Sequence, residues 1–460
     1  MSTNKMMSVV RYVGISECNH CGYCNSTRRS KAKIEDGSSN EDDHDKNETK
    51  EECNSVTFGL FARFLTLNSF NQLLDLGWSR SGKYLYKPLM EKTCCPQYTI
   101  RLDVHKFRLS RTQKRVLLAM KNYLLNDIKP KEKAIIKMES YGSSSVNKKN
   151  VQSNNKIKSK EENKELKGVD LEKYKKERAE KEAARIKTLQ SYFEYLNDEK
   201  MENEFKHRLK VTLVGQPSPE LDEDFDEEFN IFKRYQVEIH KDDPEELSPN
   251  SFTRFLASSP LINEEENDEE QQQKRHFIPP LGSYHQQYRL DGRIVAVGVV
   301  DILPNCFSSK YLFYDPDYAF LSLGVFSALW EINFTKQLSQ QRPNLHYYYM
   351  GFYLYDCPKM RYKGCFRPSD LLCDNCFDWN GMTGKTGIPD PDNQQNVEAE
   401  DQQDEDVEAE DQDEAEEDVV EAEDQQDEDV GMNQQEEVVL FNGIFNGVNN
   451  LSEMKQINIF

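Results

Sequence analysis

Four cysteines stand in two close pairs that folding could bring together. Cys21 and Cys24 are separated by two residues, and Cys94 and Cys95 are adjacent. Thiolates are the preferred ligands of zinc and of iron–sulfur clusters, and two such pairs supply four of them. The alternative is a set of thiols that are simply buried, because free cysteine is among the most buried residue types. We predict a zinc or iron–sulfur site, and the spacing fits both.

Other cysteines do not complete a second set. Cys18 and His20 are near enough to the first pair to be alternative ligands. Cys373 and Cys376 form another CxxC, but no obvious partner pair accompanies it. We therefore interpret four cysteines as structural or incidental: Cys357, Cys365, Cys373 and Cys376.

One acid is placed where burial would change its chemistry. Asp301 follows seven apolar or glycine residues, Ile294 to Val300. Burial disfavours a charged carboxylate and raises its pKa, which would make Asp301 a proton acceptor near neutral pH. An Asp that caps a turn or pairs with a nearby Arg would fit the same position, and both interpretations stay open.

The charge of the chain is segregated. Its 460 residues carry a net charge of -22, and 20 of the acidic residues lie in Val397–Val430. By contrast, Arg101–Gln190 holds 25 Lys and Arg against 12 Asp and Glu. The basic stretch suits a polyanion such as RNA, and the acidic one would repel it. No signal peptide and no run of about 18 apolar residues is present, so we expect a protein of the cytoplasm and nucleus with no membrane partner. We also expect a monomer.

Four regions follow from these patterns. Residues 1–105 form a cysteine-bearing unit with a polar, disordered insertion at 27–54, a helix over 58–76 and a strand over 98–104. Residues 106–206 are a basic linker and a charged helix. Residues 386–460 form a repetitive acidic tail, which is too polar to bury a core and is expected to be disordered.

Residues 207–385 form the largest folded unit. Strands are predicted over 208–214, 283–290, 294–302, 310–314 and 345–355, and helices over 229–240, 252–257 and 322–338. The pair Asp291-Gly292 signals a hairpin. This order of strands, helix and strand indicates an α+β fold with a GNAT-like acyltransferase core.

Long motifs in both units resemble one enzyme family. The matching segments, in family order, are Trp78–Pro88, Thr93–Arg101, Ser283–Arg289, Ile294–Pro304, Tyr311–Tyr318, Ser322–Gly324, Tyr347–Tyr353 and Lys359–Lys363. Together they cover roughly half of the chain, and they resemble eukaryotic arginyl-tRNA–protein transferases. The insertion at 27–54, the segment 125–168 and the acidic tail are not covered by the resemblance.

The resemblance implies an activity. The family moves arginine from Arg-tRNA to the α-amine of proteins that begin with Asp, Glu or oxidised Cys, which marks them for ubiquitin-dependent degradation. It also implies that Cys21, Cys24, Cys94 and Cys95 bind the metal. An α-amine with a pKa near 7.7 to 8.0 must lose a proton before it attacks an ester. Asp301 is the first candidate for the base.

Alternation along a strand divides the next candidates into two faces. His285 shares a face with Gln287, and Gln286 shares one with Tyr288. We expect one pair to line a cleft and hold the ester carbonyl or the adenosine while the other packs. His285 and Gln287 are the further catalytic candidates, and Gln286, Tyr288 and Arg289 are binding candidates.

Other binding candidates surround a helix start. Ser322, Leu323 and Gly324 would present free amides to a phosphate or carbonyl oxygen. The longer glycine-rich loop of acetyl-CoA enzymes is missing, so no acetyl-CoA is expected. Tyr349 and Tyr353 could stack on the tRNA adenosine or be plain core. The basic residues that could bind the acidic substrate side chain or a tRNA phosphate are Lys359, Arg361 and Lys363.

Two other functions are kept as alternatives. A leucyl-tRNA–protein transferase of the same fold would deliver leucine to the same acidic N-termini, although the cysteine unit argues against it. A non-catalytic, metal-containing RNA-binding adaptor is the alternative from another class.

Overall fold

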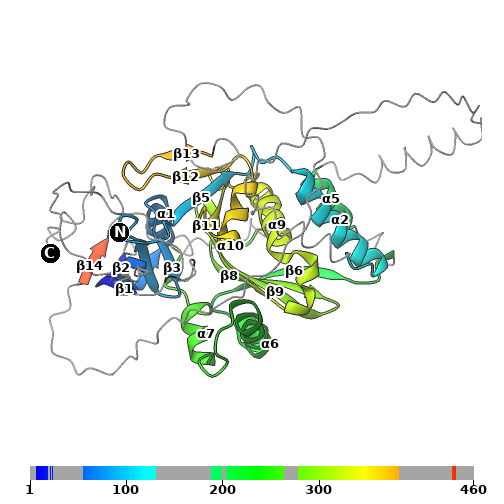
Figure 1. Cartoon of the computed structure of the whole chain (residues 1–460), viewed down its shortest axis with the longest axis horizontal. Helices are drawn as coiled ribbons and strands as arrows, with labels where there is room; N and C mark the ends of the chain where they lie inside the picture. The colour runs from blue at the N-terminus through cyan, green and yellow to red at the C-terminus, as the bar shows by residue number, and fades with distance from the viewer. Residues whose placement is uncertain are drawn as a thin grey trace, which may run out of the picture.

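The computed structural model describes residues 7–18, 21, 23, 55–130, 188–198, 204–263, 278–382 and 438–441. The insertion predicted at 27–54, most of the basic linker and almost all of the acidic tail lie outside these residues. In the part that is described, no helix combines the length and the apolar character needed to cross a membrane. The described residues form a mixed α+β structure built around two sheets (Figure 1).

The smaller sheet is built mainly from the N-terminal region. Its strand order is β14-β1-β2-β4-β3, with β7 paired to β2. The elements are β1 (Ser8–Cys18), β2 (Ser55–Thr66), α1 (Leu67–Asp75), β3 (Ser79–Ser81), β4 (Tyr84–Pro88), β7 (Leu261–Ile262) and β14 (Val438–Phe441). Four residues of the predicted disordered tail are thus a strand paired with β1, and the rest of that tail lies outside the described residues.

The larger sheet has the strand order β13-β12-β5-β11-β10-β9-β8-β6. Its strands are β5 (Tyr98–Asp103), β6 (Leu209–Gly215), β8 (Gly282–Leu290), β9 (Arg293–Ile302), β10 (Cys306–Tyr314), β11 (Tyr347–Tyr353), β12 (Asp370–Leu372) and β13 (Trp379–Gly381). Only β10 and β11 run parallel among these pairs. Since β5 comes from the N-terminal region, the two units are joined through this sheet.

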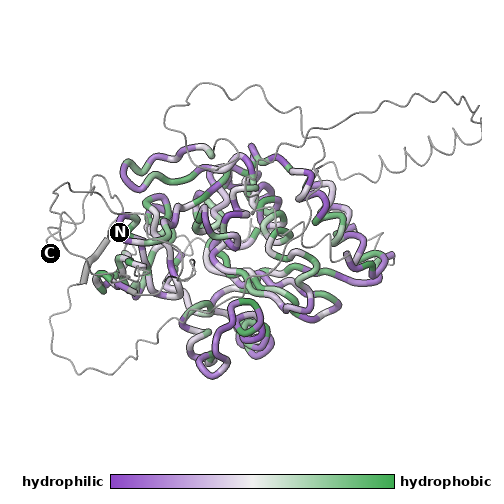
Figure 2. The backbone as a smooth tube through the Cα atoms, viewed as in Figure 1, coloured by the Kyte–Doolittle hydropathy of each residue, from purple (hydrophilic) through white to green (hydrophobic). Residues whose placement is uncertain are grey.

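Helices cover both faces of the larger sheet (Figure 1). On one face α9 packs against β10 and β11, with α2 and α5 beside it. On the other face α6 and α7 pack against β9 and β10. The bounds are α2 (Arg111–Asn126), α5 (Leu189–Leu196), α6 (Pro219–Tyr235), η3 (Gln236–His240), α7 (Pro249–Phe255), η4 (Pro316–Leu321), α9 (Leu323–Leu338), α10 (Pro358–Arg361) and η5 (Tyr362–Cys365). Figure 2 shows α6 as largely hydrophilic, which fits a helix with one side in solvent.

The turn residues explain why the central hairpin forms. Asp291 and Gly292 join β8 to β9, and both have positive φ, 51° and 88°. Such a pair gives the twist that two antiparallel strands need, so the predicted hairpin is confirmed. The other strands predicted in this unit are also present, as is the strand over 98–104.

Two predicted helices differ from the structure. The single helix predicted over 58–76 is wrong in its first part, because that part belongs to β2 and only Leu67–Asp75 is helical. Phe58, Leu60 and Ala62 are buried at every second position, and β2 pairs with β1 and β4. The helix predicted over 229–240 begins ten residues earlier, where Ser218 caps it.

Candidate functional site

Asp301 lies in a buried ion-pair network instead of an isolated apolar site. Arg80, on β3, donates from Nε to Asp301 Oδ2 (3.0 Å) and from Nη2 to Oδ1 (2.6 Å). Ser283 Oγ donates to Oδ1 (2.7 Å), and Lys310 Nζ lies 3.6 Å from Oδ2. Although burial alone would raise the pKa of Asp301, Arg80 and Lys310 hold it below its ordinary value. The predicted rise in the pKa of Asp301 is therefore wrong.

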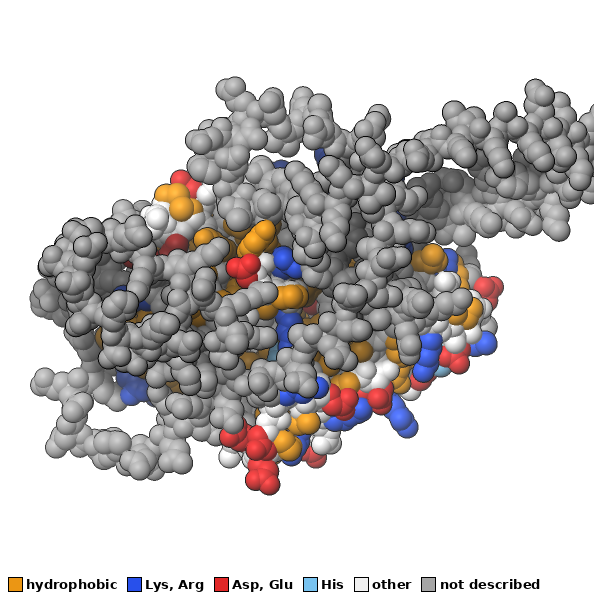
Figure 3. All heavy atoms as spheres, viewed as in Figure 1, with side chains coloured by type: hydrophobic (Ala, Val, Ile, Leu, Met, Phe, Trp, Pro, Cys, Tyr) orange, Lys and Arg blue, Asp and Glu red, His pale blue; other side chains and the backbone are white. Residues whose placement is uncertain are grey.

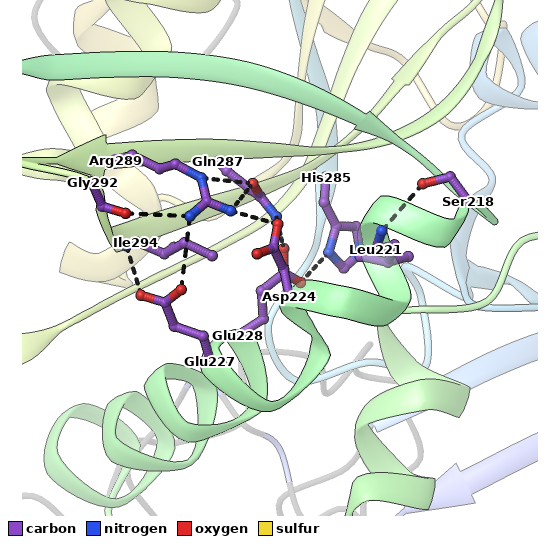
Figure 4. Close-up of polar contacts among 10 residues, drawn as sticks. All are labelled: Ser218, Leu221, Asp224, Glu227, Glu228, His285, Gln287, Arg289, Gly292 and Ile294. Atoms are coloured by element: carbon purple, nitrogen blue, oxygen red, sulfur yellow. Dashed lines mark hydrogen bonds and ion pairs between the residues drawn. The ribbon is translucent and has the colours of Figure 1, made fainter.

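His285 and Gln287 face α6 (Figure 4). His285 is fully buried, with Nδ1 2.5 Å from Glu228 Oε2 and Nε2 3.1 Å from the carbonyl oxygen of Leu256. Gln287 Nε2 donates to Glu228 (2.8 Å) and to Asp224 (3.0 Å). Because both ring nitrogens of His285 are engaged, this pair is the one that packs.

Arg289 belongs to the same packed face. Its Nη2 is 2.5 Å from Asp224 Oδ2, and its Nε donates to Gln287 Oε1 (3.2 Å). The guanidinium is thus occupied by neighbours on α6 and β8 (Figure 4). Along the lower edge of the face shown in Figure 3, charged side chains of both signs are interspersed.

Gln286 and Tyr288 point to the other face, where α9 supplies a buried carboxylate, Glu331. A Cβ placed on Gly298 would lie 3.3 Å from both Gln286 Oε1 and Glu331 Oε1. The glycine therefore lets both side chains approach the same point of β9. Neither polar atom of the Gln286 side chain, nor the Tyr288 hydroxyl, has a hydrogen-bond partner of ordinary geometry. Unpartnered buried polar groups cost free energy, so a functional role is one reason for a protein to retain them.

Glu331 has the protonation chemistry that was expected of Asp301. It is 1% exposed, and its Oε2 accepts a hydrogen bond from Tyr348 Oη (2.6 Å). Burial raises the pKa of Glu331 to about 7, although the hydroxyls of Tyr348 and Ser309 oppose the rise. A carboxyl with a pKa near the working pH can both accept and return a proton.

The start of α9, the helix that also carries Glu331, lies beside Tyr362. Ser322 has a φ of 51° and its Oγ has no hydrogen-bond partner, while Leu323 is buried. A Cβ on Gly324 would lie 3.8 Å from Tyr362 Oη. Burial and the charge of Glu331 raise the pKa of Tyr362 to about 12. The predicted Ser322–Gly324 segment and the Tyr362 region therefore converge on the Glu331 side of the sheet.

The basic cluster divides among several environments. Lys359 is exposed and donates to the carbonyl oxygen of Ile239 (3.4 Å), and Arg361 Nε is buried without a hydrogen-bond partner. Lys363 Nζ donates to the carbonyl oxygen of Phe352 (3.0 Å), and burial lowers its pKa to about 8.

Tyr349 and Tyr353 are core residues, 2% and 3% exposed, so neither ring is free to stack on a nucleotide. Tyr349 Oη donates to Asp75, which also pairs with Arg101 Nη1 at 3.1 Å. The Arg101 guanidinium lies 3.7 Å from the ring centre of Trp379. These groups border a polar cavity of about 360 Å³, also lined by Asn71, Asn305, Asn344, His346 and Tyr347.

Three of the four predicted metal ligands are brought together. The sulfur atoms of Cys21, Cys94 and Cys95 lie within 4.8 Å of one another. Bonds of about 2.3 Å to a tetrahedral metal require sulfurs about 3.8 Å apart, so a small contraction would complete the geometry. Cys24 lies outside the described residues.

Sequence reasoning missed Glu331 and Arg80. Glu331 is the single acid on α9, a helix that is otherwise mostly apolar, and that isolation was an available signal. Arg80 lies 221 residues from Asp301 and on a different sheet. Local sequence patterns do not predict a contact between residues so far apart in the chain.

Comparisons with known proteins agree on one family. Residues 19–115 match the family described as arginine-tRNA-protein transferase, N terminus, and residues 227–373 match its C terminus. Arginyl-tRNA–protein transferase 1 of Drosophila melanogaster is 32% identical, over 82% of this chain and 83% of its own. Arginyl-tRNA–protein transferase 2 of Arabidopsis thaliana is also 32% identical, over 78% and 73%. An aspartate/glutamate leucyltransferase of Pseudomonas fluorescens is 35% identical over 32% of this chain.

Proposed function

Because the chain belongs to the arginyl-tRNA–protein transferase family, we propose that it moves an arginyl group from Arg-tRNA to the α-amine of a protein beginning with Asp, Glu or oxidised Cys. The two arginyl-tRNA–protein transferases match 78% and 82% of this chain, whereas the bacterial leucyltransferase matches 32% of it. That difference favours arginine over leucine as the amino acid transferred.

We also propose that the larger sheet and α9 form a GNAT-like acyltransferase core. Strands β8, β9 and β10 form an antiparallel meander, α9 follows, and β11 returns parallel to β10. This element order supports the proposal of a GNAT-like core. The buried group of Glu331, Gln286 and Tyr288 lies between α9 and these strands, and it is the observation that carries the proposal of a reaction site.

We place the proton acceptor at Glu331 instead of Asp301. The acceptor amine is mostly protonated at neutral pH and must shed a proton to attack the ester carbonyl. Glu331, with a pKa of about 7, is matched to that task, whereas Asp301 is held ionised by Arg80. The proton taken from the amine can then return to the tRNA oxygen as the ester bond breaks. Gln286 and Tyr288 supply polar groups that would orient the reacting ester.

A direct assay tests the proposed function. The full chain is incubated with tRNA carrying labelled arginine and with peptides that begin with Asp, Glu or Ala and are otherwise identical. We expect label on the Asp and Glu peptides and none on the Ala peptide. The absence of label from the acidic peptides would contradict the enzyme, and transfer of leucine from leucyl-tRNA in its place would favour the bacterial activity.

We further propose that Cys21, Cys94 and Cys95, with Cys24 as a fourth ligand, bind zinc or an iron–sulfur cluster. The group would hold the N-terminal segment in place. We expect protein purified without oxygen to carry one metal site, and Cys94→Ser to lose it. Metal analysis with a visible absorption spectrum identifies the group. Cys365→Ser, which changes an exposed cysteine elsewhere, is the matched control and should retain the metal; equal metal content in both variants would argue against this site.

A further inference from the structure

The turn between β12 and β13 holds two thiols that the transfer reaction does not use. Cys373 N–H donates to the carbonyl oxygen of Asp378 (2.9 Å), and Phe377 N–H donates to the carbonyl oxygen of Cys373 (3.0 Å). Phe377 has a φ of 58°, so the chain reverses within a few residues. This tight turn holds Cys376 close to Cys373, three residues earlier in the chain.

The surroundings of the two sulfurs shift their pKa values in opposite directions. Hydrogen-bond donors beside Cys373, the Cys376 thiol first and then the backbone N–H groups of Cys376 and Asn375, lower the pKa of Cys373. The pKa of Cys376, whose proton is shared with its neighbour, is raised. A thiol stabilised as thiolate next to one that keeps its proton is the arrangement of an attacking and a resolving cysteine.

Access distinguishes this pair from the three buried thiols among the described residues, but not from Cys365, which is exposed, or from Cys94 and Cys95, which are half-buried. Cys376 is exposed and Cys373 is half-buried, whereas Cys21, Cys306 and Cys357 are buried. Lys87 fixes the turn from β4, since its Nζ lies 3.2 Å from Asp374 and 4.5 Å from the ring centre of Phe377.

A metal is the competing use of such a pair. Among the described residues, the groups with three or more clustered ligands do not include Cys373 or Cys376. Two thiolates supply half of a tetrahedral set, so the described surroundings favour sulfur exchange over metal binding.

We propose that Cys373 and Cys376 form a reversible dithiol–disulfide site that reacts with low-molecular-weight disulfides such as glutathione disulfide. The Cys373 thiolate attacks one sulfur of glutathione disulfide, so that a mixed disulfide forms and one glutathione thiolate leaves. Cys376 then loses its proton to solvent and attacks the Cys373 sulfur, which closes the protein disulfide and releases the second glutathione. The protein dithiol is oxidised, and one glutathione disulfide is reduced to two thiols.

The test uses the full chain in anaerobic glutathione buffers of graded oxidised-to-reduced ratio, followed by acid quenching, alkylation and peptide mass spectrometry. We expect the peptide containing both cysteines to lose two hydrogens as the ratio rises and to regain them on reduction. In Cys376→Ser, Cys373 should instead keep one glutathione. Cys365 is the internal control: its residue is exposed, but desolvation of the thiol raises its pKa, and it should react at least about tenfold more slowly than Cys373.

Two results would overturn the proposal. One is a Cys373 in the Cys376→Ser variant that is no more reactive than Cys365. The other is a pair that resists alkylation in wild type because it holds zinc, with that zinc lost in Cys373→Ser. Both readouts are independent of arginine transfer.

Discussion

Replacing Glu331 with Gln is expected to lower the single-turnover rate of arginine transfer by about 10²- to 10⁴-fold, the usual contribution of a positioned acid–base group. Gln has the shape of Glu and can still accept the hydrogen bond from Tyr348, but it cannot take a proton. The measurement is the rate of label transfer from Arg-tRNA to an Asp peptide under rapid quench, with enzyme in excess.

Two controls distinguish a loss of catalysis in Glu331→Gln from a loss of folding: the melting temperature of that variant, and a substitution of a second buried carboxylate, Glu228. Because burial raises the pKa of Glu331 above its unfolded value, its ionisation destabilises the fold as pH rises toward 7. Glu331→Gln removes that cost and should therefore melt no earlier than wild type at pH 7.5. Glu228→Gln, on the opposite face, should weaken the contact with His285 and affect melting more than rate. A Glu331→Gln variant that transfers arginine within a few-fold of wild type would remove Glu331 as the base.

Replacing Arg80 with Met is expected to lower the free energy of unfolding by about 3–5 kcal/mol, because Asp301 would be left buried with its main partner missing. Lys310 cannot substitute fully, since its Nζ lies 3.6 Å from Asp301 Oδ2 and burial, the largest cause that lowers its pKa, persists in the variant. Urea denaturation at pH 7 measures the change.

A double substitution tests whether the pair acts as a unit. Arg80→Met with Asp301→Leu removes both charges and should be less destabilised than the sum of the single variants. The pH dependence has a defined sign. Since the folded pKa of Asp301 is below its ordinary 3.8, its contribution is present above that value and is lost as the pH falls through the lower folded pKa. A cost below 1 kcal/mol for Arg80→Met would contradict the network.

The central hairpin shows how far local sequence information reaches. Asp291-Gly292 allows the turn, and the apolar run before Asp301 identifies β9 as a buried strand. Alternation also separates His285 and Gln287 from Gln286 and Tyr288 correctly. It cannot say which face meets which helix, because that depends on the packing of α6 and α9.

Long-range pairing explains the remaining errors. The region 58–66 has apolar residues at spacings that fit a helix, but pairing with β1 and β4 makes it a strand. Asp301 looked like an acid with a raised pKa because its partner, Arg80, arrives from another sheet. The clustering of Cys21, Cys94 and Cys95 could be predicted because residue type and spacing are themselves the signal.

The pH dependence of single-turnover transfer tests the central claim most directly. At saturating Arg-tRNA and Asp peptide, the wild-type rate should fall as the pH drops through about 7, where Glu331 takes up its proton and can no longer act as a base. In Glu331→Gln that inflection should vanish, and the small residual rate should follow only the acceptor amine, near 8. An inflection near 7 that persists unchanged in Glu331→Gln would contradict the account.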